Sequence, residues 1–384
     1  MSKRIMMIGP VYPYNTGISH YVSILYKQLS KKNEVSLISY TMMYPRFLYK
    51  KPQKDYEDDV LKLDDVRYML HSANPFNWIK VASYINREKP DLLLLQWMHP
   101  YFAPCYIVLT KLISKSIKIM YICHNVFPHE RFPLDKWLTK HTLRQADYFI
   151  THSKSDGEDL KTVIRDPKLI VAVHPAYNFF KIKNMSKEEA RKILNIKDNE
   201  KVLLFFGLIR EYKGLKHLLK AVKLLKERED FDTQDLKLLI AGDFGSSREV
   251  YDKMIEEYNI GDMLDITSGY IPISEVEKFF AACDIVVLPY ESATQSGVIQ
   301  VAYSFRKPVL ATRVGGLPDV VLDNETGYVV EPFDPGEIAD SIVDFFDNDR
   351  AMSFMEGIGR EAYRYSWDRM EENIYSLAGW DKED

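Results

Sequence analysis

Residues 202–226 read VLLFFGLIREYKGLKHLLKAVKLLK. The stretch opens with a continuous apolar run typical of a buried strand, and its second half repeats leucine at the spacing of an amphipathic helix. The loop between them, residues 207–214, begins and ends with glycine and carries two cations, Arg210 and Lys213. A strand, a loop and a helix in this order form the repeating unit of a parallel α/β sheet.

The same rhythm recurs on both sides of this stretch. In the first half, strands are expected at residues 4–8, 34–39, 92–96, 118–123, 148–151 and 170–173. In the second half, strands are expected at 202–206, 236–241, 264–267, 285–288, 309–312 and 328–330, with helices at 215–226 and 247–258. A polar stretch, 181–200, with a short helix near 187–194 joins the halves. The pattern predicts two α/β domains with ligands bound at the carboxyl ends of the strands.

One further helix is expected at residues 274–282. Ser274 stands where an N-cap is needed, and Glu277 follows three residues later, which is the spacing of a capping box.

Charge is distributed unevenly along the 384 residues. The net charge is −4, yet residues 1–180 carry +9 and residues 181–384 carry −13. The negative net charge argues against a general nucleic-acid binder, and the asymmetry indicates an anionic partner for the first half. The three cysteines lack metal spacing, and Cys123 and Cys283 lie in apolar runs, which favours buried thiols and a cytoplasmic location. No apolar stretch reaches the roughly 20 residues that span a bilayer.

A loop that runs into a helix follows the first strand at residues 9–21, GPVYPYNTGISHY. Gly17 near the helix start would let a phosphate approach backbone N–H groups. The alternative is an ordinary turn in which glycine serves the backbone angle. Neither G-x-G-x-x-G nor a P-loop pattern occurs in the chain, which argues against a nicotinamide, flavin or P-loop enzyme.

Two loops in the second half suit an anionic ligand. In residues 207–214, Arg210 and Lys213 at a strand end suit a diphosphate, although a solvated basic turn is the commoner role for such residues. Residues 289–298, PYESATQSGV, lead into an apolar helix, and its start at 296–298 forms a second anion site. Glu291 is a candidate acceptor for sugar hydroxyls, or else a charge that serves the helix start alone.

Histidine follows another strand end at His124, with His129 and Glu130 close in sequence. A histidine there can donate to a sugar hydroxyl or a phosphate, although a lone histidine is more often structural. Asp230 and Asp232 form a D-x-D pattern in a polar loop before a strand, where we do not expect a metal.

With these residues in view, the sequence resembles the retaining glycosyltransferases of family 4 (glycosyl transferases group 1), over nearly its whole length. The resemblance is strongest in residues 203–221 and 269–332, which include AACDIVVLP, KPVLAT, GGLPDVV and NETGYVVEP. It implies a GT-B fold with two Rossmann-like domains that face each other across a cleft, and a C-terminal helix that crosses back to the first domain. The implied domains are an acceptor-side domain, 1–178 with helix 366–384, and a nucleotide-sugar-binding domain, 179–365.

The resemblance also implies roles for single residues. Arg210 and Lys213 would contact the diphosphate, and His124 would lie beside the donor sugar; these three are the expected catalytic residues. The remaining expected donor-binding residues are Gly17, Tyr270, Ile271, Glu291, Ser296, Gly297 and Val298.

Two positions depart from the family pattern. Leu208 occupies the place where an arginine usually follows the glycine. The second glutamate of the family's E-x7-E pair falls on Val301, and the first falls on Ala293 rather than Glu291. The usual ribose ligand is therefore replaced.

The sequence thus predicts a retaining hexosyltransferase that moves a sugar from a UDP- or GDP-sugar to a hydroxyl of a glycan or lipid-linked acceptor, in cell-surface polysaccharide or glycolipid synthesis. We expect no metal or other cofactor and no nucleic-acid partner. The alternatives are a non-catalytic nucleotide-sugar-binding protein and a GT-B sugar-nucleotide epimerase. Basic and apolar residues mix at 44–54 and 111–118, which favours peripheral contact with an anionic membrane at the inner face of the cell membrane, or else reflects an ordinary surface and core.

Overall fold

The computed structural model describes residues 2–14, 16–46, 48, 53–56, 59–128 and 132–380. The chain forms two compact units, the first made of Met1–Val173 with Trp367–Asp384 and the second of His174–Ser366. The first unit ends at residue 173, five residues before the boundary expected from the sequence.

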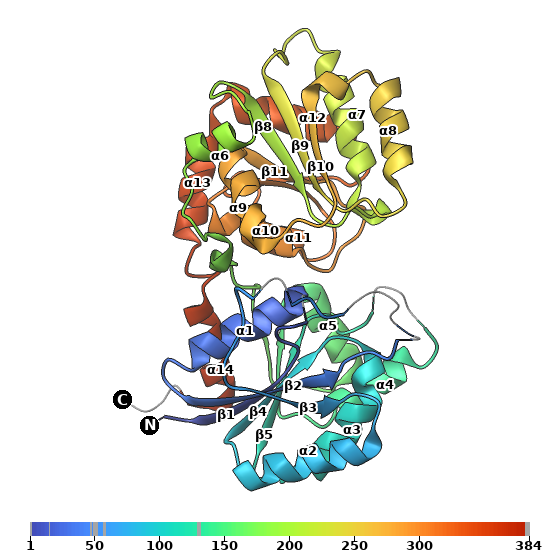
Figure 1. The fold of residues 1–384 in the computed structure, drawn as a ribbon, viewed down its shortest axis with the longest axis vertical. Helices are drawn as coiled ribbons and strands as arrows, with labels where there is room; N and C mark the ends of the chain where they lie inside the picture. Colours follow the sequence, from blue (N-terminus) through green and yellow to red (C-terminus); the bar gives the residue numbers. More distant parts are fainter. Residues whose placement is uncertain are drawn as a thin grey trace. The chain divides into compact units, whose positions relative to one another are not determined.

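The first unit contains a parallel seven-stranded sheet in the order β3-β2-β1-β4-β5-β6-β7 (Figure 1). Its strands are β1 (Arg4–Ile8), β2 (Glu34–Met42), β3 (Val66–His71), β4 (Leu92–Trp97), β5 (Lys118–Cys123), β6 (Tyr148–Thr151) and β7 (Leu169–Val171). The strand order reverses between β1 and β4: β2 and β3 extend the sheet on one side of β1, and β4 to β7 extend it on the other. Such a switch point is where open α/β sheets bind ligands.

Helices cover this sheet in two groups. The helices are α1 (Gly17–Leu29), α2 (Pro75–Glu88), α3 (Ala103–Leu112), α4 (Asp135–Leu143), α5 (Lys154–Val163) and α14 (Trp367–Ala378). Helices α2 to α5 contact one another in chain order, whereas α1 packs against α14. Gln28 of α1 donates to Glu371 and Asp368 of α14 at 2.7 and 2.8 Å, so the last helix is fastened to the first unit.

The second unit contains a parallel six-stranded sheet in the order β10-β9-β8-β11-β12-β13. Its strands are β8 (Lys201–Phe206), β9 (Leu236–Gly242), β10 (Leu264–Ser268), β11 (Ile285–Leu288), β12 (Val309–Thr312) and β13 (Gly327–Val330). Its helices are α6 (Lys187–Ile193), α7 (Leu215–Lys226), α8 (Arg248–Glu257), α9 (Ile273–Ala282), α10 (Gly297–Ser304), α11 (Leu317–Val320), α12 (Pro335–Asp347) and α13 (Arg350–Arg360). Two sheets of this kind confirm the predicted GT-B architecture of two Rossmann-like domains.

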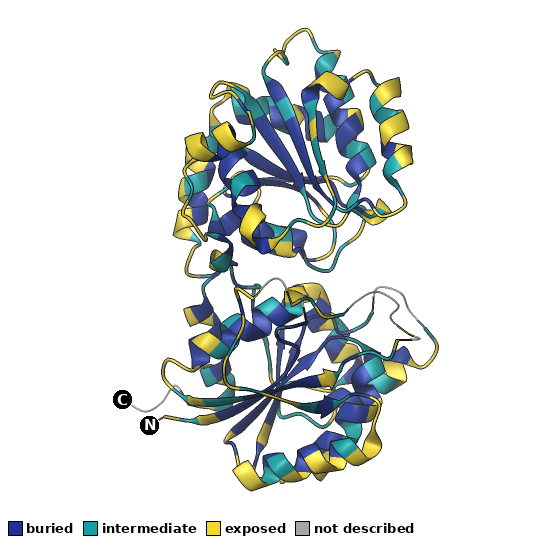
Figure 2. Ribbon diagram, viewed as in Figure 1, coloured by how far each residue is buried: buried dark blue, intermediate teal, exposed yellow. Residues whose placement is uncertain are grey.

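The apolar pattern explains why these elements form. Helix α7 buries its leucine face in the core of the second unit, whereas its lysines are exposed or partly exposed. Strand β8 is buried along residues 202–205. In Figure 2 the strands of both sheets are largely buried, while exposed residues gather on the helices. Burial of this apolar surface is the main driving force for folding of each unit.

The structure corrects the expectation for the helix near residue 274. Helix α9 begins at Ile273 after Pro272 and has no side-chain cap. Glu277 does not close a capping box, because its carboxylate accepts from the backbone N–H groups of Lys183 and Met185 at 2.7 and 2.8 Å. A tertiary partner therefore replaces the local one.

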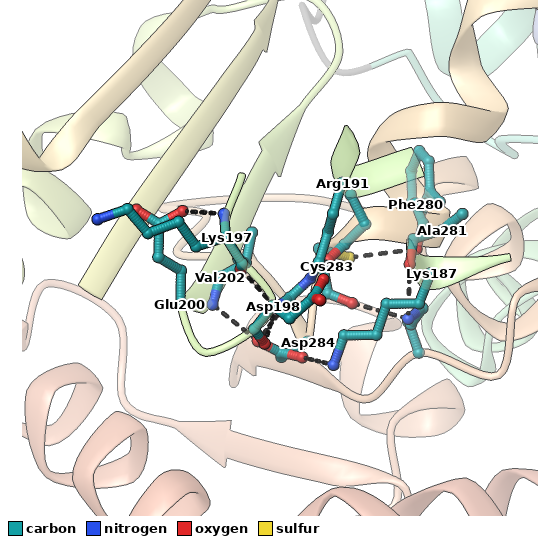
Figure 3. Close-up of polar contacts among 12 residues, drawn as sticks. Lys187, Arg191, Lys197, Asp198, Glu200, Val202, Phe280, Ala281, Cys283 and Asp284 are labelled. Atoms are coloured by element: carbon teal, nitrogen blue, oxygen red, sulfur yellow. Dashed lines mark hydrogen bonds and ion pairs between the residues drawn. The ribbon is translucent and has the colours of Figure 1, made fainter. Parts of the chain in front are cut away.

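A buried ion cluster joins α6 to the sheet of the second unit (Figure 3). The side chain of Arg191 is 2% exposed and donates to Asp284 at 3.0 Å and to the backbone oxygens of Ala282, Lys197 and Asp198. Asp284 also accepts from Lys187 at 2.6 Å and from the backbone N–H of Val202 at 2.8 Å. We refer to Lys187, Arg191 and Asp284 as the Arg191 cluster.

The cysteines Cys105, Cys123 and Cys283 are buried and free, and burial raises the pKa of the Cys283 thiol to about 12.

None of the described helices has the length and hydropathy that a bilayer crossing demands. In the basic stretch 111–118, Ile113 and Ile117 belong to the core and Leu112 is exposed. This arrangement leaves the stretch with fewer apolar side chains for a membrane than the sequence indicated.

Candidate functional site

The predicted donor-binding residues of the second unit lie at one edge of its sheet. The loops after β8, β10 and β11 carry them, and these strands with β9 occupy neighbouring places in the sheet. Because all the strands are parallel, their carboxyl ends meet at this edge. The structure therefore brings Arg210, Lys213, Glu291 and the start of α10 to one side of the unit.

Gly207 stands at the centre of this edge. Its φ is +104°, and a Cβ built on it would lie 3.3 Å from Nζ of Lys213 and 3.8 Å from Val298. Glycine at this position adopts a backbone conformation that other residues rarely adopt, and its lack of a side chain lets Lys213 and Val298 lie close to the backbone. Lys213 and the first turn of α10 consequently flank the same small space.

Arg210 and Lys213 are available for an anion. Among the described residues, neither side chain is ion-paired with a carboxylate, and Nη1 of Arg210 donates to its neighbouring carbonyl of Ile209 at 3.0 Å. Burial lowers the pKa of Lys213, and the charge of Arg210 acts in the same direction. A bound diphosphate would remove this repulsion, since an opposite charge favours the ammonium form.

Helix α10 begins at Gly297, directly after the buried Ser296. Ser296 makes no side-chain cap bond to the helix; its hydroxyl lies 3.3 Å from that of Tyr290. A helix start without a side-chain cap presents N–H groups and a positive dipole end, which together attract phosphate oxygens.

Glu291 is already held within the second unit. Its Oε1 lies 2.8 Å from Nζ of Lys216 and 2.9 Å from Nε2 of His217, both on α7. Burial alone raises the pKa of Glu291, but hydrogen bonds from Lys216 and His217 outweigh it and the pKa is lowered. This carboxylate fastens the β11 loop to α7, and its predicted contact with a sugar stays a prediction.

Val301, at the position of the usual ribose ligand, is 5% exposed and offers no polar group. Tyr270 and Ile271 follow β10, and Tyr270 is 59% exposed. An exposed aromatic ring at the strand edge is suited to contact a nucleobase. The expected base contact through backbone groups stays a prediction.

In the first unit, Gly17 is the first residue of α1. Thr16 caps the helix and forms a capping box with Ser19, with bonds of 3.1 and 2.8 Å. Gly17 has no positive φ, and a Cβ built on it meets no described atom within 4 Å. Neither the backbone angle nor crowding within the described residues requires glycine at this position.

His124 follows β5 and is buried. Its Nε2 lies 2.8 Å from Oε1 of Gln96 on β4, and its ring packs edge-on against Tyr21 with centroids 4.9 Å apart. With the amide in this orientation, Oε1 of Gln96 accepts from the Nε2–H of His124. Sequence reasoning missed Gln96, although a single polar residue inside LLLLQW was a usable signal.

Several residues of the motifs in the sequence analysis lie outside the described residues: residue 15 of the stretch 9–21, residues 47 and 49–52 of the basic stretch 44–54, His129 and Glu130. Asp230 is held by Arg228 at 2.9 and 3.0 Å, and Oδ1 of Asp232 accepts from the backbone of Gln234. The D-x-D pattern therefore has local structural partners.

The two Rossmann-like units, one with a cationic edge at the carboxyl ends of its strands, define a protein of the GT-B class. Its fold is similar to a glycosyltransferase from Rickettsia africae, with a TM-score of 0.74 and 17% identity over 100% of both chains. It is also similar to Anabaena Alr3699/HepE in complex with UDP, with a TM-score of 0.73 and 15% identity over 98% of this chain and 99% of that one.

The chain belongs to glycosyltransferase family 4. The family model described as glycosyl transferases group 1 matches residues 186–364, and the model described as Glycosyltransferase Family 4 matches residues 15–179. A D-inositol 3-phosphate glycosyltransferase of Corynebacterium diphtheriae is 27% identical over 242 residues, which cover 61% of this chain and 56% of that protein. The chain thus spans little more than half the length of this curated relative.

Proposed function

We propose that the protein is a retaining glycosyltransferase that moves a sugar from a nucleoside diphosphate sugar to a hydroxyl of a glycan or lipid-linked acceptor. The observation that carries this proposal is Lys213 beside Gly207 and the start of α10, with Arg210 near enough for its charge to act on Lys213. Neither cation has a carboxylate partner among the described residues. The HepE structures contain UDP or UDP-glucose, which supports a donor of the same kind. Synthesis of cell-surface polysaccharide or glycolipid is the setting we infer.

Each group has a distinct part in the proposed reaction. The sugar leaves the diphosphate through an oxocarbenium-like state, and the acceptor hydroxyl enters on the same face. Arg210, Lys213 and the N–H groups of α10 stabilise the negative charge that grows on the leaving diphosphate. The diphosphate itself takes the acceptor proton, and no metal is required in this scheme.

The donor is tested first. A thermal-shift panel of UDP-, GDP- and ADP-sugars identifies the donor base, and release of free nucleoside diphosphate then measures transfer or hydrolysis. Binding without release would support the alternative of a non-catalytic nucleotide-sugar-binding protein. Comparison of the anomeric proton signals of donor and product decides whether the configuration is retained.

The role of the cations is tested by Lys213→Ala. We expect kcat to fall about 100-fold, because loss of one preorganised donor to a developing charge has this effect. Lys220→Ala, which removes an exposed lysine from the neighbouring α7, is the matched control and should leave kcat unchanged. Wild-type kcat in Lys213→Ala would refute the assignment.

A further inference from the structure

Tyr290 contacts both parts of the proposed diphosphate site. It is the second residue after β11 and is 2% exposed. Nζ of Lys213 lies 5.5 Å from the centroid of its ring, and its hydroxyl lies 3.3 Å from that of Ser296, which precedes α10. The lysine and the helix start come from different loops, and they share this one buried neighbour.

The fold fixes the position of Tyr290 through its backbone and its neighbours. The hydroxyl of Thr312 on β12 donates to the backbone oxygen of Tyr290 at 2.6 Å. The backbone oxygen of Tyr212 accepts from the N–H of Glu291 at 2.7 Å, and the ring of Tyr212 packs edge-on against that of Tyr290 with centroids 6.3 Å apart. These contacts fasten the loops after β8 and β11 to each other, so the ring of Tyr290 stays beside Lys213.

The aromatic ring suits Lys213 better than a carboxylate would. A partly buried ammonium group needs a favourable partner. A carboxylate would attract it strongly, but would also neutralise the charge that a diphosphate has to bind and would repel the diphosphate itself. The face of an aromatic ring attracts an ammonium group more weakly and carries no net charge. Burial raises the pKa of Tyr290 to about 12, so its hydroxyl stays neutral at neutral pH. The ring therefore holds Lys213 with its charge available.

The hydroxyl of Tyr290 has a separate effect on the helix start. A serine at the N-cap ordinarily accepts a hydrogen bond from an N–H group of the first turn. Ser296 stands at the N-cap of α10 with extended backbone angles, yet its side chain makes no such bond, and its hydroxyl contacts Tyr290 instead. The N–H groups of the first turn are thus not capped by the serine and can bind an anion.

We propose that Tyr290 is a positioning residue that keeps the diphosphate site open: its ring holds Lys213 without neutralising it, and its hydroxyl draws Ser296 away from the start of α10. The inference rests on the proposed function in taking a diphosphate as the ligand. The two contacts can be removed separately, because phenylalanine keeps the ring and loses the hydroxyl, whereas leucine loses both.

The hydroxyl is tested by Tyr290→Phe, titrated with UDP and with GDP by calorimetry. Affinity should fall about fivefold, the equivalent of a typical serine cap, because Ser296 can now turn onto the first turn and compete with the ligand. The double variant Tyr290→Phe, Ser296→Ala cannot form this cap and should recover wild-type affinity. Tyr303→Phe is the matched control: it removes another buried tyrosine hydroxyl of α10, 2.7 Å from that of Thr326, and should leave affinity unchanged. A double variant that binds as weakly as Tyr290→Phe would refute the competition.

The ring is tested in the background of Ser296→Ala, where no serine cap can form. Tyr290→Leu should bind UDP or GDP about two- to fivefold more weakly than Tyr290→Phe, because the ammonium group of Lys213 loses its aromatic partner. The same comparison is repeated with Lys213→Ala, and the difference between leucine and phenylalanine should then disappear. A difference of equal size with and without the lysine would mean that the ring acts only through packing, which contradicts its proposed role.

The capping change is also measured without any nucleotide. The amide of Val298, in the first turn of α10, should exchange its hydrogen more slowly in Tyr290→Phe than in the wild type, and the wild-type rate should return in Tyr290→Phe, Ser296→Ala. Unchanged exchange in Tyr290→Phe would overturn the proposal even if UDP or GDP binds normally. Slower exchange together with no binding of either nucleotide by the wild type would support the role of Tyr290 at the helix start and count against the proposed function.

Discussion

Removal of Asp284 should unfold the second unit at a markedly lower temperature. Asp284→Ala takes the only carboxylate from the Arg191 cluster, so the guanidinium of Arg191, 2% exposed, loses its counter-charge. The backbone N–H of Val202 loses its acceptor at the same time. Removing one partner of a buried ion pair costs roughly 3–5 kcal/mol.

The structure places the effect toward the lower end of that range. Arg191 keeps its bonds to three backbone oxygens, and Lys187 is partly exposed and contributes little. We therefore expect a loss of about 3 kcal/mol. For a unit of this size, 1 kcal/mol shifts Tm by about 2–4 °C, so the unfolding midpoint should fall by about 6–12 °C.

Differential scanning calorimetry of the full chain measures this shift. Asp230→Ala is the matched control, because it removes an exposed carboxylate from a surface ion pair with Arg228 and should leave the midpoint nearly unchanged. The double variant Arg191→Met, Asp284→Leu should be more stable than Asp284→Ala, since it leaves no buried charge without a partner. A midpoint for Asp284→Ala within 2 °C of that for Asp230→Ala would refute the reasoning.

Three further predictions follow from single residues. Gly214→Ala should destabilise the second unit by about 1–3 kcal/mol and lower donor affinity. Gly214 has φ +66°, and the Cβ of an alanine would lie 1.9 Å from the backbone oxygen of Pro289. Thermal unfolding measures the loss of stability, and donor titration measures the loss of affinity. Folding lowers the pKa of Glu291, so the Glu291 carboxylate stabilises the fold above the ordinary glutamate pKa of about 4.3, and this stabilisation is lost as the pH falls through the folded pKa. The difference in unfolding free energy between wild type and Glu291→Gln should therefore vanish on acidification. Glu371→Ala should cost about 1.5–3 kcal/mol and speed amide exchange in α14, because the buried carboxylate accepts from Gln28; unchanged exchange would contradict it.

Most strands could be predicted because both sheets are buried on two faces. Their continuous apolar runs are the strongest signal that parallel strands give. Strand β3 was missed because it is an edge strand with a mixed pattern: Arg67 and Tyr68 are exposed, and its register against β2 shifts twice. An edge strand pairs on one side only, so its sequence is less constrained.

The site was predictable to a smaller extent. Gly207 and the basic residues near it could be found because they stand directly after a strongly apolar strand. The polar Gln96 inside LLLLQW is visible in the sequence, but its partner is not, because His124 follows the neighbouring strand β5, 28 residues later. The partners of Glu291 were likewise hidden, since they lie on α7, more than 70 residues earlier.

The charge asymmetry has a local meaning that the net charge conceals. The second half of the chain carries −13, so a cation on its surface has many carboxylates available within reach of a long side chain. Lys216, Arg228 and Arg313 are paired in this way. Arg210 and Lys213 are not paired with a carboxylate among the described residues, although Glu211 lies between them in sequence and instead approaches Lys216 at 3.7 Å. Burial that lowers the pKa of Lys213 makes its charge costly until an anion arrives. Under the proposed function, the acidic unit as a whole would repel anions, and a diphosphate would bind at the carboxyl edge of its sheet, where Arg210, Lys213 and the backbone N–H groups of α10 can act on it together.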